Sequence, residues 1–318
     1  MDFTKLSISS LTECQLMQLE ELERNCGLEP FSRRMLLESV AEMDTFAMLD
    51  GEKIAGFITL HSSNRYDGDC LYVVNLNVSE EYRRKGVATQ LILSACSAYA
   101  DVLANGNVML DVRKDNNAAL ALYQKLGFTV TDIHSENGET DVVMSVELKD
   151  LLGIVQTPRL MLRRMTSLDM LDGARILRDE RVNKTYMIPD LTEESAKKLY
   201  TRFADLSAKR DRYVRGIYQN NRLVGFINDP EIQESSLELG WVVDPEYHNQ
   251  GFCTEAVTHA IQDLFDRGFT EVLAGAFVEN PASIRVMEKS GMQLIEKTEE
   301  IEYRGQTHHC IFYAIRRK

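Results

Sequence analysis

The pattern of apolar and polar positions divides the first part of the chain into short helices and strands. Residues 13–24 and 32–43 carry apolar side chains at helical spacing, with Cys26-Gly27 as a break between them. Residues 46–49 and 53–60 have the composition of two apolar strands joined by a tight Asp-Gly turn. The pattern therefore predicts two helices followed by a β-hairpin.

The stretch from Leu71 to Tyr99 combines a strand, a basic loop and a helix. Residues 71–79 form a near-continuous apolar run, which is typical of a strand buried on both faces, and the apolar positions after residue 90 have helical spacing. The loop between them is basic and ends in Gly86. Because a helix that follows a strand presents free N–H groups at its start, this loop is a candidate site for a pyrophosphate.

The remaining elements of the first half complete a mixed sheet. Residues 108–113 are predicted as a strand, a helix follows Asn116, and residues 141–148 are predicted as the final strand. The order is β, α, α, β, β, β, α, β, α, β. This order predicts an α/β fold with helices on both faces of a mixed β-sheet.

The second half of the chain repeats the first. Four landmarks recur in the same order at offsets of 164 to 169 residues. They are residues 54–58 and 223–227, Gly86 and Gly251, Asn116 and Asn280, and Gly127 and Gly291. A fresh first strand is expected at residues 157–163. We therefore expect two domains, residues 1–150 and 155–318, joined by a short apolar connection rather than a flexible linker.

Two motifs of the first half resemble those of one enzyme superfamily. Residues 83–88 resemble the Q/R-x-x-G-x-G/A acetyl-CoA loop of the GNAT N-acetyltransferases, and residues 116–128 resemble their N-x-x-A-x-x-x-Y-x-x-x-G-F segment. The second half is similar to the RimJ/RimL branch through T-P-R-L-x-L-R at 157–163 and G-W-V-V-D-P-E-Y at 240–247. The resemblance implies two GNAT-like domains in tandem.

The resemblance also implies acetyl-CoA as the co-substrate. The central strand is expected to separate from its neighbour near residues 76–78, which would free a backbone N–H for the thioester carbonyl. The residues that match the donor-binding positions are Leu76, Asn77, Val78, Arg83, Arg84, Lys85, Gly86, Val87, Ala88, Thr89 and Asn116 in the first copy, and Val243, Gly251, Cys253, Thr254 and Asn280 in the second.

Transfer to an amine needs a group that accepts the ammonium proton and a group that protonates the leaving thiolate. The resemblance implies that Tyr123 is the general acid, and Asp111 is the candidate base because a carboxylate occurs there in related enzymes. The plainer alternatives are a half-buried aromatic residue for Tyr123 and a solvated strand residue for Asp111. Asn75 and Asn77, which are polar on an otherwise apolar strand, are candidates to orient a water.

The second copy departs from the pattern where the chemistry needs it. Its positions answering the acid and the base hold Met287 and Gly275, and its loop has Cys253 where Gly or Ala is usual. Glu238 is an alternative base and Ser283 a weak alternative donor. The first copy is therefore predicted to be the catalytic one, and the second to be degenerate or to shape the acceptor site.

Composition and charge limit the function classes. With 44% hydrophobic and 27% charged residues, the chain has the composition of a soluble globular protein. Its net charge of −13 argues against nucleic acid as a partner and mildly favours amine-bearing ones, although solubility alone would explain it. The start of the sequence lacks the pattern of a signal peptide, and no apolar run could span a membrane, so a cytoplasmic location is expected. The six cysteines show no metal-ligand spacing, which predicts free thiols and no metal.

Together these features predict an acetyl-CoA-dependent N-acetyltransferase that transfers the acetyl group directly to a primary amine. The acceptor is either a small molecule or a protein N-terminus, and the sequence leaves this choice open because acceptor loops vary within a fold. The alternative from another class is a non-catalytic CoA-binding or interaction protein.

Overall fold

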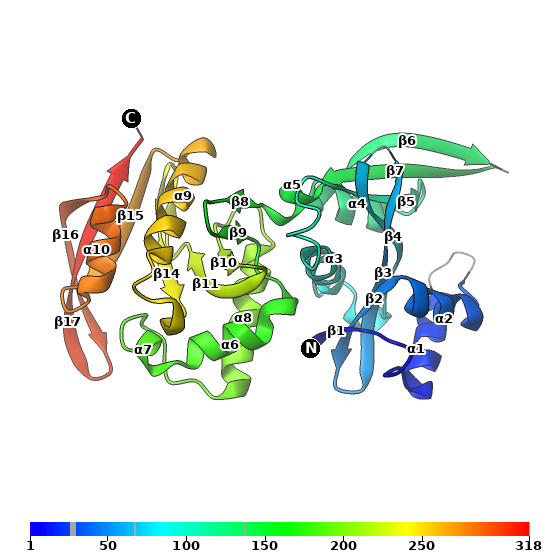
Figure 1. The fold of residues 1–318 in the computed structure, drawn as a ribbon, viewed down its shortest axis with the longest axis horizontal. Coiled ribbons are helices and arrows are strands. Elements are labelled where there is room, and N and C mark those ends of the chain that lie inside the picture. The colour runs from blue at the N-terminus through cyan, green and yellow to red at the C-terminus, as the bar shows by residue number, and fades with distance from the viewer. Residues whose placement is uncertain (26–29, 67, 137, 318) are drawn as a thin grey trace. The chain divides into compact units, whose positions relative to one another are not determined.

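A computed structural model describes residues 1–25, 30–66, 68–136 and 138–317. The chain divides into two compact units (Figure 1): unit 1 is Met1–Gly153 with Thr166–Leu168, and unit 2 is Ile154–Met165 with Asp169–Lys318. The Cys26-Gly27 break expected between the first two helices lies outside the described residues. None of the helices in the described part of the chain combines the length and apolar character needed to cross a bilayer.

Unit 1 is built on one seven-stranded mixed sheet in the order β1-β2-β3-β4-β5-β7-β6. Its strands are β1 (Asp2–Lys5), β2 (Asp44–Asp50), β3 (Lys53–Tyr66), β4 (Gly68–Val78), β5 (Asn107–Arg113), β6 (Thr129–Glu136) and β7 (Glu139–Glu147). Its helices are α1 (Glu13–Arg24), α2 (Arg33–Glu42), α3 (Val87–Ser97), α4 (Asn117–Leu126) and α5 (Leu148–Leu152), with a short 3₁₀ turn at Glu80–Tyr82. The α/β class predicted from the sequence is confirmed.

The prediction of a single final strand was wrong. The structure has a hairpin of β6 and β7, paired antiparallel, where only the second of these strands was expected. β6 is an edge strand, and both of its large apolar side chains, Val130 and Ile133, are more than half exposed. A strand with little buried surface carries no alternating apolar pattern, so periodicity could not reveal β6.

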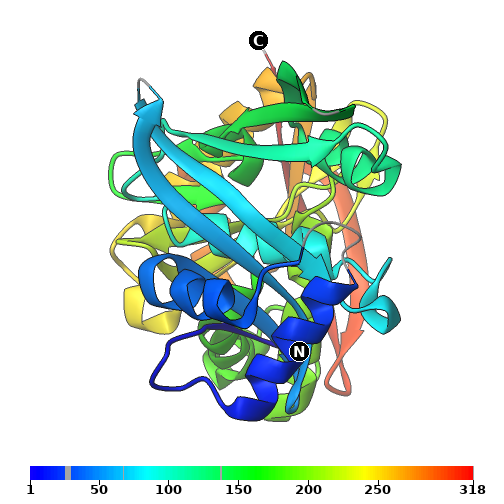
Figure 2. The ribbon, with the colours of Figure 1, turned by 90° about the vertical axis from the view of Figure 1, so that its right-hand side faces the viewer.

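A bulge in β4 decides which side chains face α1 and α2. Leu60 pairs with Val73 and Thr59 pairs with Asn75, so Val74 is an extra residue on β4. The face that carries Phe57 packs against the leucines of α1 in one apolar cluster, and Figure 2 shows α1 and α2 in front of these strands. Because Asn77 pairs with Phe57, the bulge turns Asn75 and Asn77 toward α1.

β4 and β5 separate part-way along their length. Their parallel pairing ends at Val73 and Leu110, while β4 continues to Val78 and β5 to Arg113. The backbone of β4 beyond the bulge therefore pairs with β3 but not with β5. The separation predicted near residues 76–78 agrees with this geometry.

Unit 2 distributes its strands over two sheets. One has the order β14-β11-β10-β9-β8 and the other β12-β13-β15-β17-β16. The strands are β8 (Val155–Gln156), β9 (Met161–Arg163), β10 (Arg215–Gln219), β11 (Arg222–Asn228), β12 (Ile232–Gln233), β13 (Ser236–Glu238), β14 (Gly240–Val243), β15 (Glu271–Phe277), β16 (Gln293–Tyr303) and β17 (Gln306–Arg316). The helices are α6 (Met170–Arg178), α7 (Glu180–Asn183), α8 (Glu193–Ser207), α9 (Phe252–Asp266) and α10 (Pro281–Lys289). Both sheets and α9 contribute to one core cluster, and Figure 1 shows α9 between the sheets.

Of the strand expected at residues 157–163, only the last three residues, Met161–Arg163, form a strand. A turn closed by the Thr157 N–H to the Leu160 carbonyl, 2.9 Å long, separates β8 from β9. The Thr157 hydroxyl oxygen reinforces the turn by accepting from the Leu160 N–H at 2.9 Å. Local hydrogen bonding of threonine beside a proline explains why an extended pattern folds here as a turn.

The repeated glycines of the two units lie against a neighbouring backbone. A Cβ on Gly56 would lie 2.7 Å from the Asn77 carbonyl oxygen, and one on Gly225 would lie 2.3 Å from the Val242 carbonyl oxygen. Neither contact can be relieved by rotating a side chain. A side chain at either position must therefore push two paired strands apart.

We expect Gly225→Val to destabilise unit 2 by about 1–3 kcal/mol, the usual cost of inserting atoms into a packed core. The only tryptophan of the chain, Trp241, pairs across from Ile227 on the neighbouring strand, so its fluorescence follows unfolding of this unit. Urea titration should show a lower midpoint. Gly56→Val is the matched control in unit 1 and should shift the fluorescence transition less; equal shifts would contradict the interpretation.

Candidate functional site

The basic loop of unit 1 leads directly into α3. Gly86 is the N-cap of this helix with a φ of 83°, and Arg84 also has a positive φ, 61°. No side chain caps the helix start, and its first N–H groups, those of Val87, Ala88 and Thr89, have no acceptor within the helix. The loop thus presents free donors at the positive end of a helix dipole, which is a site for phosphate oxygens.

Unit 2 reproduces this backbone. Asn249 has a φ of 61° and Gly251 a φ of 79°, and α9 begins at the next residue, again without a side-chain cap. The three residues before the glycine differ completely between the two loops, yet the left-handed residues occupy equivalent positions. Conformation is therefore preserved where side chains have changed, as an anion site made from backbone N–H groups requires.

An ion pair buttresses the second loop. The Glu255 carboxylate on α9 accepts from the Thr157 hydroxyl at 2.6 Å, the Arg159 N–H at 2.8 Å and the Arg159 Nε at 2.7 Å. Arg159 also donates to the Gln250 carbonyl at 2.9 Å and stacks on Phe252. Burial alone would raise the pKa of Glu255, but these hydrogen bonds outweigh burial and hold the pKa below its usual value.

Tyr123, the predicted acid, lies on α4 with 7% of its surface exposed and packs against Phe128. Burial raises the pKa of its phenol to about 12. No hydrogen bond joins its hydroxyl to another residue that the structure describes, so the proton is available to a ligand. Asn116, at the start of the same helix, is the N-cap, and its side chain accepts from the Ala119 N–H at 3.1 Å.

Asp111, the predicted base, is exposed on β5 and accepts a short hydrogen bond from the Tyr72 hydroxyl. Tyr72 pairs with Met109 two residues before Asp111, so the tyrosine and the aspartate share one face of the sheet. This partner fixes one oxygen of the carboxylate. The sequence did not identify Tyr72.

Glu23 is a buried carboxylate that the sequence reasoning missed. It lies on α1 with 2% of its surface exposed and accepts from the amides of Asn75 and Asn77, the latter at 2.7 Å, and from the Phe31 N–H at 3.0 Å. The amides of the two asparagines thus bind Glu23, and their role in orienting a water stays a prediction. A signal existed, because Glu23 continues the apolar stripe of Leu16 and Leu19 along α1.

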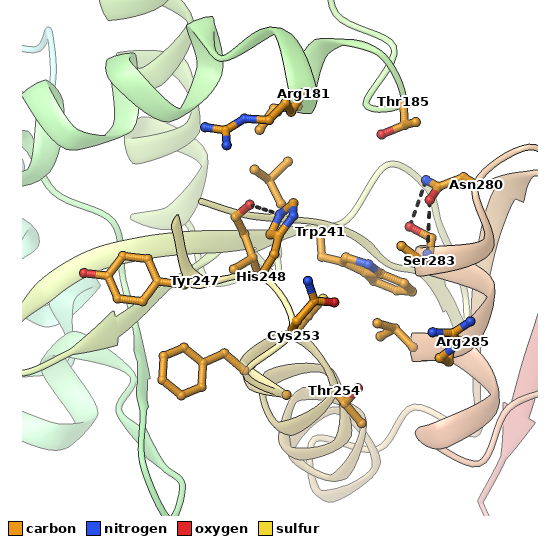
Figure 3. Close-up of a pocket in the computed structure, with 18 of the residues that line it drawn as sticks. Arg181, Thr185, Trp241, Tyr247, His248, Cys253, Thr254, Asn280, Ser283 and Arg285 are labelled. Carbon is orange, nitrogen blue, oxygen red and sulfur yellow. Dashed lines mark hydrogen bonds between the residues drawn. The ribbon is translucent and has the colours of Figure 1, made fainter. Parts of the chain in front are cut away.

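A cavity of about 340 Å³ lies against the second loop (Figure 3). Its lining includes the second-copy donor positions predicted from the sequence: Val243, Gly251, Cys253, Thr254 and Asn280. Arg181, Arg285 and Lys289 add positive charge. Figure 3 shows Trp241 directed into the space between α9 and α10. Burial raises the pKa of the Cys253 thiol to about 12, which keeps this thiol protonated at neutral pH.

A second cavity of about 320 Å³ adjoins the first, since Trp241, Asn280 and Ser283 line both. It contains Glu238, whose carboxyl pKa is raised by burial and lowered in part by Lys297. Gly275, the position answering Asp111, gives room to Phe312, whose ring would lie 2.8 Å from a Cβ there.

No group of three or more potential metal ligands occurs among the described residues.

Comparison with known families assigns both halves. Residues 15–128 match the model of the acetyltransferase (GNAT) family, and residues 159–293 match that of the acetyltransferase (GNAT) domain. The chain belongs to the GNAT family. It carries two GNAT domains in tandem, as the sequence predicted. The first match falls within unit 1, and the second falls within unit 2 except for residues 166–168.

Individual relatives match parts of this GNAT protein. An N-alpha-acetyltransferase of Sulfurisphaera tokodaii is 35% identical over 80 residues, 24% of this chain and 48% of the relative. A mycothiol acetyltransferase of Corynebacterium efficiens is 36% identical over 98 residues, 29% of this chain and 30% of the relative. The chain thus spans half or less of the length of these relatives. A solved RimL chain in complex with coenzyme A is 17% identical, with a TM-score of 0.47, and the match covers 51% of this chain and 97% of that one.

We expect Glu255→Gln to destabilise unit 2 at pH 7 by about 1–2 kcal/mol, because it weakens hydrogen bonds to a charged group. The folded-state pKa of Glu255 is depressed, so its contribution is present above the unfolded-state pKa near 4.3 and is lost as pH falls below it. Urea unfolding followed by Trp241 fluorescence should show a gap between parent and variant at pH 7 that shrinks below about pH 4. A gap that is independent of pH would contradict this origin.

Proposed function

We propose that the chain is an acetyl-CoA-dependent N-acetyltransferase that moves the acetyl group directly to a primary amine. The observation that carries the proposal is the arrangement at the end of β4: the strand parts from β5, and a loop with free N–H groups starts α3. Membership of the GNAT family and the coenzyme A held by the solved RimL chain support it. The alternative, a CoA-binding protein without turnover, would keep the loop but would not need a free phenol.

In this proposal the first domain, residues 1–150, is catalytic. The amine nitrogen attacks the thioester carbonyl carbon, the new C–N bond forms, and the C–S bond breaks. The ammonium proton passes to Asp111 through a water, and Tyr123 gives its proton to the departing thiolate. The second proton, which the nitrogen loses as the amide forms, returns through water to the tyrosinate. The phenol of Tyr123 supports this role because its hydroxyl has no hydrogen-bond partner among the described residues. Its raised pKa keeps the proton on the group at neutral pH but makes the phenol a weaker acid than an exposed tyrosine.

Donor binding in the first domain would use the backbone of Leu76 to Val78 and the loop from Arg83 to Thr89, with Asn116 at the start of α4. We assign Glu23 a positioning role. It ties α1 to the two asparagines of β4 and so holds the helix beside the parted strands.

The second domain, residues 155–318, would bind a second donor molecule through the cavity beside Gly251 but contribute less to turnover. Met287 is fully buried in the core and has no proton to give, in contrast to Tyr123. The acceptor is a small amine or a protein N-terminus. The relatives support both, since one is named for N-terminal and one for mycothiol acetylation.

Gly86→Glu should weaken acetyl-CoA binding to the first domain at least tenfold, about 1.4 kcal/mol, and reduce turnover, because its carboxylate would occupy the phosphate position. Gly86→Ala is the control for the positive φ alone and should lose less. Gly251→Glu should leave most turnover intact. Calorimetry and thiol release measure both quantities. Loss of turnover in Gly251→Glu but not in Gly86→Glu would show that the second domain, and not the first, is catalytic.

Tyr123→Phe keeps the ring but removes the proton, so kcat should fall by about 10²- to 10⁴-fold. Acetyl-CoA affinity should stay within about threefold of the parent, since the phenol acts on the leaving group. In the parent, the pKa near 12 predicts no fall in kcat from this phenol below about pH 11. If the variant keeps the parental kcat under conditions where chemistry limits the rate, Tyr123 serves only in packing and another group protonates the thiolate.

A further inference from the structure

The second cavity of unit 2 is lined mainly by apolar side chains and contains one acidic group. Four aromatic side chains line it, those of Tyr186, Phe203, Trp241 and Phe277, together with aliphatic groups from several elements. Among its described lining residues Glu238 is the one that carries a charge. A carboxylate in an aromatic cavity favours a ligand that is cationic at one end and apolar at the other.

The carboxylate is only partly neutralised by the protein. Lys297 Nζ lies 4.0 Å from Glu238 Oε2, the long limit of an ion pair, and lies closer to Glu299, at 3.3 Å. The same ammonium lies 4.0 Å above the ring of Phe312, which holds it to one side. No hydrogen bond from another described side chain reaches the Glu238 carboxylate. A ligand ammonium can therefore approach it more closely than Lys297 does.

The position of Glu238 connects this cavity with acyl transfer. Glu238 is the last residue of β13, just before Leu239, where the central strand passes from one sheet to the other. Trp241, Asn280 and Ser283 separate the Glu238 cavity from the one beside the Gly251 loop and line both. A ligand amine beside Glu238 would thus lie at the junction with a thioester in the first cavity.

We infer that unit 2 binds a small primary amine that carries an aromatic or similarly sized apolar group, with the group in this cavity and the ammonium against Glu238. A volume of about 320 Å³ lies at the lower end for ligand cavities, which fits one ring rather than a larger molecule. The inference rests on the proposed function only in assigning the adjoining cavity to the acyl donor.

The sole tryptophan makes the cavity directly observable in the full chain. The protein is titrated with 2-phenylethylamine, without acetyl-CoA, and Trp241 fluorescence is recorded. We expect a saturable change. The neutral analogue 2-phenylethanol and the ringless amine ethylamine should each bind at least about tenfold more weakly, since each lacks one of the two interactions. Equal binding of 2-phenylethanol, or no saturable response to the amine, would overturn the inference.

Glu238→Gln should weaken binding of 2-phenylethylamine at least about tenfold. Glu300→Gln is the matched control, because it removes a carboxylate from the same domain but neither lines the cavity nor pairs with Lys297; it should bind as the parent does. Parental binding by Glu238→Gln would overturn the inference.

Circular dichroism checks that both variants fold, and the comparison of ligands on the parent tests the inference without any variant. A chain that consumes acetyl-CoA but shows no Trp241 response would contradict this inference and leave the proposed function standing.

Discussion

The structure depends on the point in each unit where the central strand leaves its neighbour. Paired strands satisfy each other's N–H and C=O groups. A strand inside a sheet can therefore offer its backbone groups to an extended ligand only where that pairing stops. In unit 1 the pairing of β4 with β5 stops at Val73, and in unit 2 the central strand is divided at Leu239. The phosphate loop follows the same strand in both units, so the parted edge and the helix start lie on one continuous stretch of chain.

The two units achieve this separation to different extents. Unit 1 keeps one sheet and bends β4 by a bulge at Val74, which also turns Asn75 and Asn77 toward Glu23. Unit 2 splits into two sheets, and two adjoining cavities lie beside the split, with Trp241 at their junction. The larger separation leaves room for a ligand that unit 2 would recognise through side chains, whereas the two loops would bind phosphate through backbone N–H groups alone.

What the sequence could predict is what local residues decide. A glycine with positive φ before a helix and an asparagine that caps the next helix are visible as a motif, and the repeat of Gly86 and Gly251 follows from the same requirement. β6 could not be predicted, because an exposed edge strand needs no apolar alternation. Glu23 was missed because its partners on β4 lie 52 and 54 residues away, and only the fold brings them together. The cavities likewise could not be predicted, because they are lined by residues of α7, α10 and β13, which are far apart in the sequence.

The chain has therefore preserved and varied different parts of one fold for different physical reasons. Phosphate recognition by N–H groups constrains only φ and ψ, so the second loop could replace Arg-Arg-Lys by His-Asn-Gln and keep its shape. Proton transfer constrains a particular side chain, and a buried position accepts Met287 as readily as Tyr123 on packing grounds alone. In the proposed division of labour, unit 1 handles the proton at Tyr123 and unit 2 needs only packing at the matching position. The acceptor side of unit 2 is then free to differ, and the cavity that Glu238 lines is where we infer such a difference.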